Sequence, residues 1–303
     1  MLRKAHLNLI ARHSLKHGLR GGAGLVSIAL TLMIGLLLSQ CAVGPLESVD
    51  KIDARAERAG LDQDQRDYAK KQANKQLVTL AVQIMKWTTD PSDEQLEYLT
   101  EDKPAMISVL LVLLFFATPL FGCLGGFNQT AGDIGSKGLR FLLFRTERAN
   151  IFWGRFLGTL AFTAAVNLLL FVILGLYMAA KIKVHPTGDM LLWMGQGYLR
   201  MMVFTLPYVA LCAWISSAME SAFGALAISL LVAFFAPLLF GVIGGVMGAG
   251  EQIQYLQLIT PWGYKYWLLE PMGLKFFGGI AVMFGFSALF LWLGHRNFSR
   301  RDL

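Results

Sequence analysis

Charge is scarce in this sequence. Only 16% of its 303 residues are Asp, Glu, Lys or Arg, whereas 55% are hydrophobic. A soluble domain of this size needs a larger polar surface, unless lipid serves as its solvent. The formal net charge of +7 could indicate a nucleic-acid partner. However, most basic residues lie in short clusters beside hydrophobic runs, as orientation signals do, so we expect no nucleic acid to bind.

Cysteine and the common catalytic motifs are also scarce. The three cysteines, Cys41, Cys123 and Cys212, lie in or beside apolar runs, without a CxxC pair or a Cys/His cluster. This pattern argues against both a disulfide framework and a zinc site. The sequence has no G-x-x-x-x-G-K-[ST] loop, no G-x-S-x-G elbow and no HExxH pair. We therefore expect no enzyme activity, no cofactor and no metal in this chain.

Long hydrophobic runs, by contrast, are abundant. A membrane-spanning helix needs about 20 mostly apolar residues, and six runs reach this length. Pro119, Pro207 and Pro237 lie inside the second, fourth and fifth runs and favour kinks there. The sequence predicts an all-α integral membrane protein with six transmembrane helices. The predicted spans are residues 23–43, 105–126, 156–180, 190–217, 222–249 and 276–294.

Basic residues predict the orientation of these spans. Residues 1–22 carry five Lys or Arg residues and no acid, and residues 127–155 and the tail 295–303 are also basic. Six crossings put these segments on one side, which the positive-inside rule assigns to the cytoplasm. We expect a multi-pass protein of the cell inner membrane with both termini in the cytoplasm. Four lysines then lie outside and weaken this signal: Lys181, Lys183, Lys265 and Lys275.

The N-terminal segment, residues 1–22, has spaced Leu and Ile residues among basic residues and histidines. This amphipathic pattern suits a helix that lies among anionic lipid headgroups. We predict a cytoplasmic elbow helix that leads into the first span. The alternative is a merely basic, frayed lead.

Residues 44–104 form an extracytoplasmic insertion between the first two spans. The stretch 51–86 is rich in Ala, Gln and charged residues and contains no Pro, so we expect a helix. After a break at residues 90–91, Ser92 and Gln95 have the spacing of a capping box, which predicts a short helix that begins directly after Ser92. The insertion either binds an extracytoplasmic protein partner or caps the spans.

The connection at residues 127–155 contains the most informative pattern. Glycines interrupt its first half, a hydrophobic run follows at residues 139–144, and a charged corner follows at residues 145–148. An apolar patch rimmed by charge is typical of a docking surface for another protein. The same residues would also suit an amphipathic segment on the inner leaflet.

This connection resembles a known family. Asp133 is followed by Gly138, Leu139, Leu142 and Leu143. The pattern is similar to the acidic residue and the G-x-L-x-x-L-L run that follow the second span in permeases of type-2 ABC exporters. The glycine lies one residue nearer to the first leucine than in that run, and the Arg-containing corner lacks the family's proline.

Two later segments also resemble this family. Residues 256–264 are similar to the external segment before its last span, and residues 298–303 to its F-x-R-R-D ending. The resemblance implies a six-span type V fold with a re-entrant external segment, here residues 250–275. It also implies a cytoplasmic nucleotide-binding ATPase subunit, which holds ATP and Mg, and a second permease in a homo- or heterodimer. The ATPase would contact a coupling helix near residues 128–137.

The resemblance and the pattern together nominate residues for coupling. Glu220, in the inner turn between the fourth and fifth spans, is a candidate for a second ATPase contact or simply a solvated turn residue. The candidate coupling and docking residues of the connection are Asp133, Lys137, Gly138, Arg140, Leu142, Arg145, Glu147 and Arg148.

Arg200 is the only charge well inside a predicted span. An intramembrane charge suggests a role in a substrate path or in gating, with structural pairing or snorkelling as the alternative. Several glycine pairs have small-xxx-small spacing, which predicts closely packed helices and no more. These pairs are Gly154 and Gly158, Gly241 and Gly245, and Gly244 and Gly248.

These observations favour one function. We expect the permease subunit of an ABC exporter, half of a dimeric pore that a separate ATPase drives. The alternative is a non-transporting membrane scaffold or sensor that binds a partner through its external insertion. A neighbouring gene for an ATPase with a P-loop would distinguish the two.

Overall fold

The predicted all-helical membrane class is confirmed. The computed structural model describes residues 4–58, 62–89, 92–181, 187–239 and 257–301, and within these ranges it contains helices and no strand. Six of the described helices are long and apolar enough to cross a membrane. The candidate spans are Gly22–Gly44 in α2 (Gly22–Arg58), Ala105–Gly135, which starts with α5 (Ala105–Gly126), α8 (Arg148–Lys181), α9 (Thr187–Ala218), Ala222–Leu239, which starts with α10 (Ala222–Leu230), and α13 (Leu274–Arg300).

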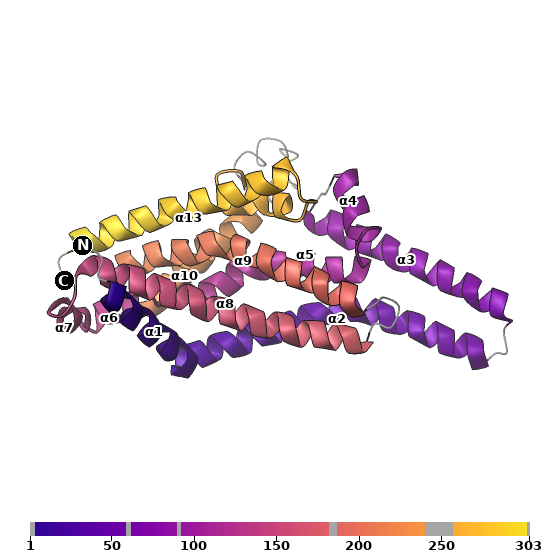
Figure 1. Ribbon diagram of the computed structural model, residues 1–303, viewed down its shortest axis with the longest axis horizontal. Coiled ribbons are helices and arrows are strands. Elements are labelled where there is room, and N and C mark those ends of the chain that lie inside the picture. Colours follow the sequence, from indigo (N-terminus) through magenta and orange to yellow (C-terminus); the bar gives the residue numbers. More distant parts are fainter. Residues whose placement is uncertain (1–3, 59–61, 90–91, 182–186, 240–256, 302–303) are drawn as a thin grey trace.

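The shorter helices lie at the two ends of this bundle. Figure 1 shows both chain termini at one end, together with α6 and α7; we name this the terminal end. The other end, named the insertion end, carries α3 and α4. The bounds are α1 (Lys4–Arg20), α3 (Gln63–Thr89), α4 (Asp93–Thr100), α6 (Ala131–Gly135), α7 (Leu139–Leu143) and the 3-10 helix η2 (Pro261–Leu268).

Two helices form the centre of the bundle. α5 and α9 bury most of their side chains, which fits sequences that are apolar nearly all round. α2, α8, α10 and α13 surround them and leave large apolar side chains on the outside, such as Leu37, Leu176, Phe223 and Trp292. Because lipid tails are as apolar as these side chains, such exposure suits a bilayer and would be unfavourable in water.

α1 packs directly against α8, and glycines permit the contact. A Cβ atom on Gly158 would lie 2.5 Å from the carbonyl oxygen of Ala11, and one on Gly154 would lie 2.8 Å from Cβ of Ile10. The predicted close packing at this glycine pair is confirmed, and its partner is α1. Figure 1 shows α1 crossing α8 obliquely at the terminal end before the chain bends into α2.

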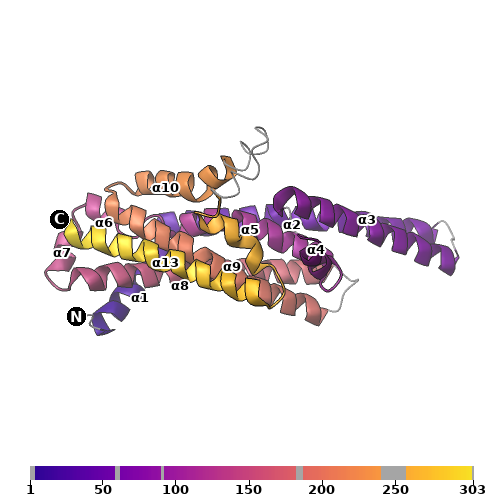
Figure 2. The same ribbon diagram turned by 90° about the horizontal axis from the view of Figure 1, so that it is seen from above.

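The insertion is helical over most of residues 51–86, as expected, and its two helices form a hairpin. α2 continues beyond its span to Arg58, and α3 returns beside it, so that the two form an arm beyond the bundle (Figures 1 and 2). At the base of the arm, Ala42 and Val43 of α2 and Ala81 and Met85 of α3 are fully buried. A single straight helix could not bring both groups into one core, which is why the chain folds back.

The predicted helix after Ser92 is confirmed, but only half of its capping box forms. The Ser92 hydroxyl accepts a hydrogen bond from the backbone N–H of Gln95, at 3.3 Å. The Gln95 side chain does not return to Ser92. Its Nε2 donates instead to the backbone carbonyl of Tyr266, at 3.1 Å. A tertiary contact has replaced the local one.

The fifth span is described only as far as Leu239. After α10, residues Leu231–Phe235 form a π-helical turn just before Pro237. Proline has no N–H for the carbonyl four residues earlier, so the regular hydrogen-bond ladder cannot continue there. The glycine pairs at 241–248 and the first part of the expected re-entrant segment, residues 250–256, lie outside the described residues.

Candidate functional site

The connection between α5 and α8 forms the candidate site at the terminal end. It consists of α6, a turn and α7, and it is shorter than expected because α8 already begins at Arg148. In the turn, Lys137 has φ of +58°, a left-handed conformation that few non-glycine residues adopt. This residue reverses the chain, and Gly138 directly precedes α7.

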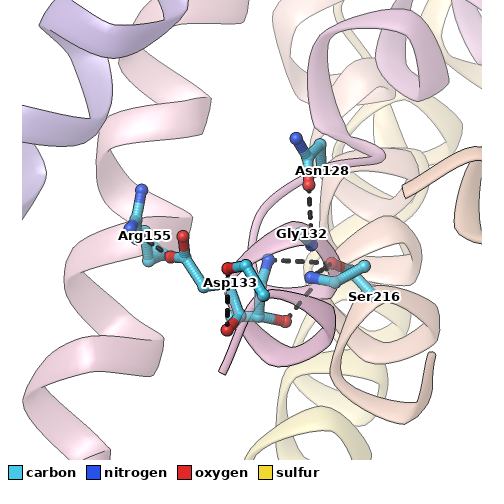
Figure 3. A network of polar contacts seen from close by, with 8 residues as sticks. Asn128, Gly132, Asp133, Arg155 and Ser216 are labelled. Atoms are coloured by element: carbon cyan, nitrogen blue, oxygen red, sulfur yellow. Dashed lines mark hydrogen bonds and ion pairs between the residues drawn. The ribbon is translucent and has the colours of Figure 1, made fainter. Parts of the chain in front are cut away.

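The start of α6 is fixed to α9 by a buried serine. The backbone N–H groups of Thr130 and Ala131 both donate to Ser216 Oγ, each at 2.9 Å (Figure 3). Gln129 Nε2 donates to the Val209 carbonyl at 3.0 Å, also in buried surroundings. Ser216 therefore satisfies N–H groups that an isolated helix start would leave unpaired. Any displacement of α6 must break these bonds or move α9.

A second anchor joins α6 to α8. The Asp133 carboxylate forms an ion pair with the Arg155 guanidinium (Figure 3). The Arg155 side chain is 11% exposed and that of Asp133 33%. Half-buried pairs of this kind hold elements together because either partner alone would be a poorly solvated charge. The predicted coupling residue Asp133 is thus bound within the chain.

The structure brings the connection and Glu220 together. A Cβ atom on Gly135, at the end of α6, would lie 2.1 Å from the Glu220 carbonyl oxygen, so only glycine permits this approach. The Glu220 carboxylate accepts from Arg301 Nη2 at 2.8 Å, and Arg301 Nη1 donates to the Ser217 carbonyl at 3.1 Å. The turn between α9 and α10 therefore lies between α6 and the C-terminal residues.

Arg148 and Glu147 start α8. Arg148 Nη1 donates to the backbone carbonyls of Ser299 and Arg301, which ties α8 to the end of α13. The Glu147 carbonyl accepts from the Ile151 N–H at 3.2 Å, as the first bond of the helix. Arg148 therefore has an intramolecular role, although the sequence nominated it for docking.

α7 has a buried face and an exposed face. Leu139 is buried in a cluster with Ile151, Phe156, Val209 and Phe298, and Leu142 packs partly against it. On the outside, Phe141 is 76% and Phe144 87% exposed, and Lys137 and Arg145 are exposed beside them. Arg140 lies in α7, but its side chain is outside the described part of the structure. We name Lys137, Phe141, Phe144 and Arg145 the terminal patch.

Arg200 lies in a different environment, toward the insertion end. It is 4% exposed, and its Nη1 donates to the carbonyls of Leu268 and Glu270 at 3.1 and 3.0 Å. Its Nη2 donates to the Tyr98 hydroxyl at 3.4 Å. The guanidinium also lies over the rings of Trp193 and Phe276, 5.2 and 4.9 Å from their centroids. This arrangement corresponds to the structural-pairing alternative.

A comparison with protein families then decides the identity of the chain. A family model described as ABC-2 family transporter protein matches residues 9–303. The chain belongs to the ABC-2 transporter family. No curated protein matches it. Membership makes the chain the membrane component of an ABC transporter, not itself catalytic, and implies association with an ATPase subunit.

In this ABC-2 chain, the anchors of the connection were not evident from the sequence. Ser216, Arg155 and Arg301 stand 86, 22 and 81 positions from the residues they bind. A serine near a helix end and an arginine near a membrane boundary are common, so neither residue carries a distinctive signal. Among the described residues, no group of three His, Cys, Asp or Glu side chains could hold a metal ion.

Proposed function

We propose that this chain is the permease subunit of an ABC exporter in the cell inner membrane, with the terminal end in the cytoplasm. A separate ATPase, which holds ATP and Mg, docks on the terminal patch, and a second permease completes a pore of the six-span type V fold. This proposal depends on two observations together. The chain belongs to the ABC-2 family, and the aromatic side chains of Phe141 and Phe144 are exposed close in sequence to α6, which is anchored to α8 and α9. Exposed aromatic and basic residues are typical interface anchors.

Movement of the ATPase would reach the spans through the anchors of α6. Ser216 passes a displacement to α9, and the Asp133–Arg155 pair passes it to α8. The tight contact between Gly135 and Glu220 passes it to the turn that starts α10. Because these three contacts are short and partly buried, a push on α6 would move the spans as rigid bodies.

Replacing Phe144 tests the docking surface. The chain is purified with an affinity tag from its native cells, and the co-purified ATPase subunit is quantified. Phe144→Glu puts a charge at the most exposed aromatic position of the patch, so binding should fall about 30-fold or more. Tyr68→Glu is the matched control, because Tyr68 is an exposed aromatic residue on α3, at the opposite end. Unchanged ATPase recovery with Phe144→Glu would refute docking at this patch.

The same preparation separates docking from transmission. Asp133→Arg changes no residue of the terminal patch, so the ATPase subunit should still bind. It places two arginines next to each other, so the permease should no longer stimulate the rate of ATP hydrolysis. The double variant Asp133→Arg with Arg155→Asp restores the opposite charges and should recover part of the stimulation. Equal loss in the single and double variants would show that the ion pair does not transmit.

A further inference from the structure

The segment before α13, described from residue 257, is held by residues far from it in sequence. Its helix η2 receives a hydrogen bond from α4 of the insertion: Gln95 Nε2 donates to the Tyr266 carbonyl at 3.1 Å. Gln95 is only 3% exposed. A buried amide that lost this acceptor would be left with an unpaired donor, which is costly. Because Gln95 is buried, this contact between α4 and η2 is part of the fold.

Arg200 holds the same segment from inside the bundle. The carbonyl of Leu268, the last residue of η2, and the carbonyl of Glu270, two residues later, both accept from Arg200 Nη1. The last carbonyls of a helix lack partners within it and carry a partial negative charge, so a buried guanidinium is a fitting cap.

Tyr98 joins the two attachments. It lies one turn after Gln95 on α4, and its hydroxyl accepts from Arg200 Nη2. Its ring meets Trp193 edge-on, with centroids 5.8 Å apart, and Trp193 in turn lies under Arg200. α4 thus touches the segment directly through Gln95 and indirectly through the pair Tyr98 and Arg200.

We propose that α4 of the insertion is a latch for residues 257–273, with Gln95, Tyr98 and Arg200 as its positioning residues. The latch makes movement of the insertion and movement of this segment one event. By thermodynamic reciprocity, loosening either one loosens the other. The latch itself does not rest on the proposed export function. One consequence of the latch does rest on that function: a protein that binds the α2–α3 arm would alter the outer face of the permease.

Hydrogen exchange of the full-length chain in lipid nanodiscs tests the latch without any ATPase. Gln95→Met keeps the size of the side chain but removes the donor, and Tyr98→Phe removes only the hydroxyl. In both variants, peptides within residues 257–273 should exchange faster, by about tenfold for Gln95→Met. Glu94→Gln is the matched control on the exposed side of α4, and it should exchange as the unmodified protein does.

The reciprocal variants examine Arg200. Arg200→Met should accelerate exchange in α4, residues 93–100, and Arg200→Lys should restore part of the protection because an ammonium can still donate to one carbonyl. Unchanged exchange at 257–273 in both α4 variants would overturn the proposal. An equal acceleration of hydrogen exchange in α7, at the opposite end of the bundle, would also overturn the proposal. That result would indicate that the variants loosen the whole protein and not this segment in particular.

Discussion

Lys265 is a buried lysine whose amino group lies over two aromatic rings. It lies in η2, and its ammonium is 4.2 Å from the centroid of the Trp262 ring and 4.5 Å from that of Tyr266. Among the described residues, no carboxylate forms an ion pair with it. Burial lowers the pKa of Lys265 from 10.5 to about 7, although the two ring faces favour the charged form.

This lowered pKa predicts a pH dependence of stability. Between pH 7 and 10.5 the unfolded chain holds a proton on Lys265 that the folded chain does not, so the free energy of unfolding should rise with pH across this range. Lys265→Met should remove this increase in the free energy of unfolding with pH. It should also stabilise the protein at pH 7, because no amino group is then buried. The measurement is the thermal unfolding midpoint in detergent at pH 7 and pH 9.5.

Lys275→Met is the control for this prediction. Lys275 is 59% exposed and pairs with Glu270 at 3.2 Å, so its loss should leave the difference between the two pH values unchanged. If Lys265→Met retains the full pH dependence of the unmodified chain, then another group causes it.

At the scale of elements, the α1–α8 contact depends on the missing side chains of two glycines. Sequence spacing was sufficient to predict a packed interface at Gly154 and Gly158. It was insufficient to predict the partner, because helix spacing describes one surface and not the surface that meets it. α1 fills this place with Ile10, Ala11 and Ser14.

Enlarging this interface should release α1. In Gly158→Leu the new side chain meets the Ala11 backbone, which cannot move aside cheaply, and we expect a destabilisation of about 1–3 kcal/mol. Trypsin should then cut faster after Arg12, Lys16 and Arg20 in the detergent-solubilised protein. Gly195→Leu on α9 is the control, since a Cβ there has no neighbour within 4 Å. Equal cleavage of the two variants would contradict tight packing of α1.

At the scale of the whole molecule, Figure 1 shows the terminal end and the insertion end at opposite ends of the bundle, and we expect them to face opposite sides of a membrane. Tyr68 on α3 and Phe144 after α7 are both well exposed, and among the described residues one candidate span, Ala105–Gly135 with α5, lies between them in the sequence. They are therefore suitable positions for a test of orientation, which the positive-inside rule assigns but the fold alone does not.

Labelling of single cysteines should resolve the orientation. In a chain with Cys41, Cys123 and Cys212 replaced by alanine, an impermeant maleimide should label Tyr68→Cys in intact cells. Phe144→Cys should be labelled only after the membrane is permeabilised. Labelling of both from outside would mean that α5 does not cross the bilayer, and the reverse pattern would invert the proposed topology.

The class of the protein follows from its amino-acid sequence without any structure. Six apolar runs of sufficient length permit little besides membrane helices, because every backbone N–H and C=O must be satisfied within lipid. Local signals were also reliable where the partners are near in sequence. The Ser92 cap is one example, since its hydroxyl and the Gln95 N–H are three residues apart.

How the helices are joined depends on contacts between residues that are distant in the sequence. In the folded chain the Gln95 side chain binds Tyr266 and not its own cap, and Asp133 pairs with Arg155. The hydrophobic run at residues 139–144 has a buried Leu139 and an exposed Phe144. α3 also returns beside α2. The same physical reason applies to each of these contacts. The position of a residue in the sequence fixes the face of the helix on which it lies. Its partner, however, depends on which distant helix or segment packs against that face.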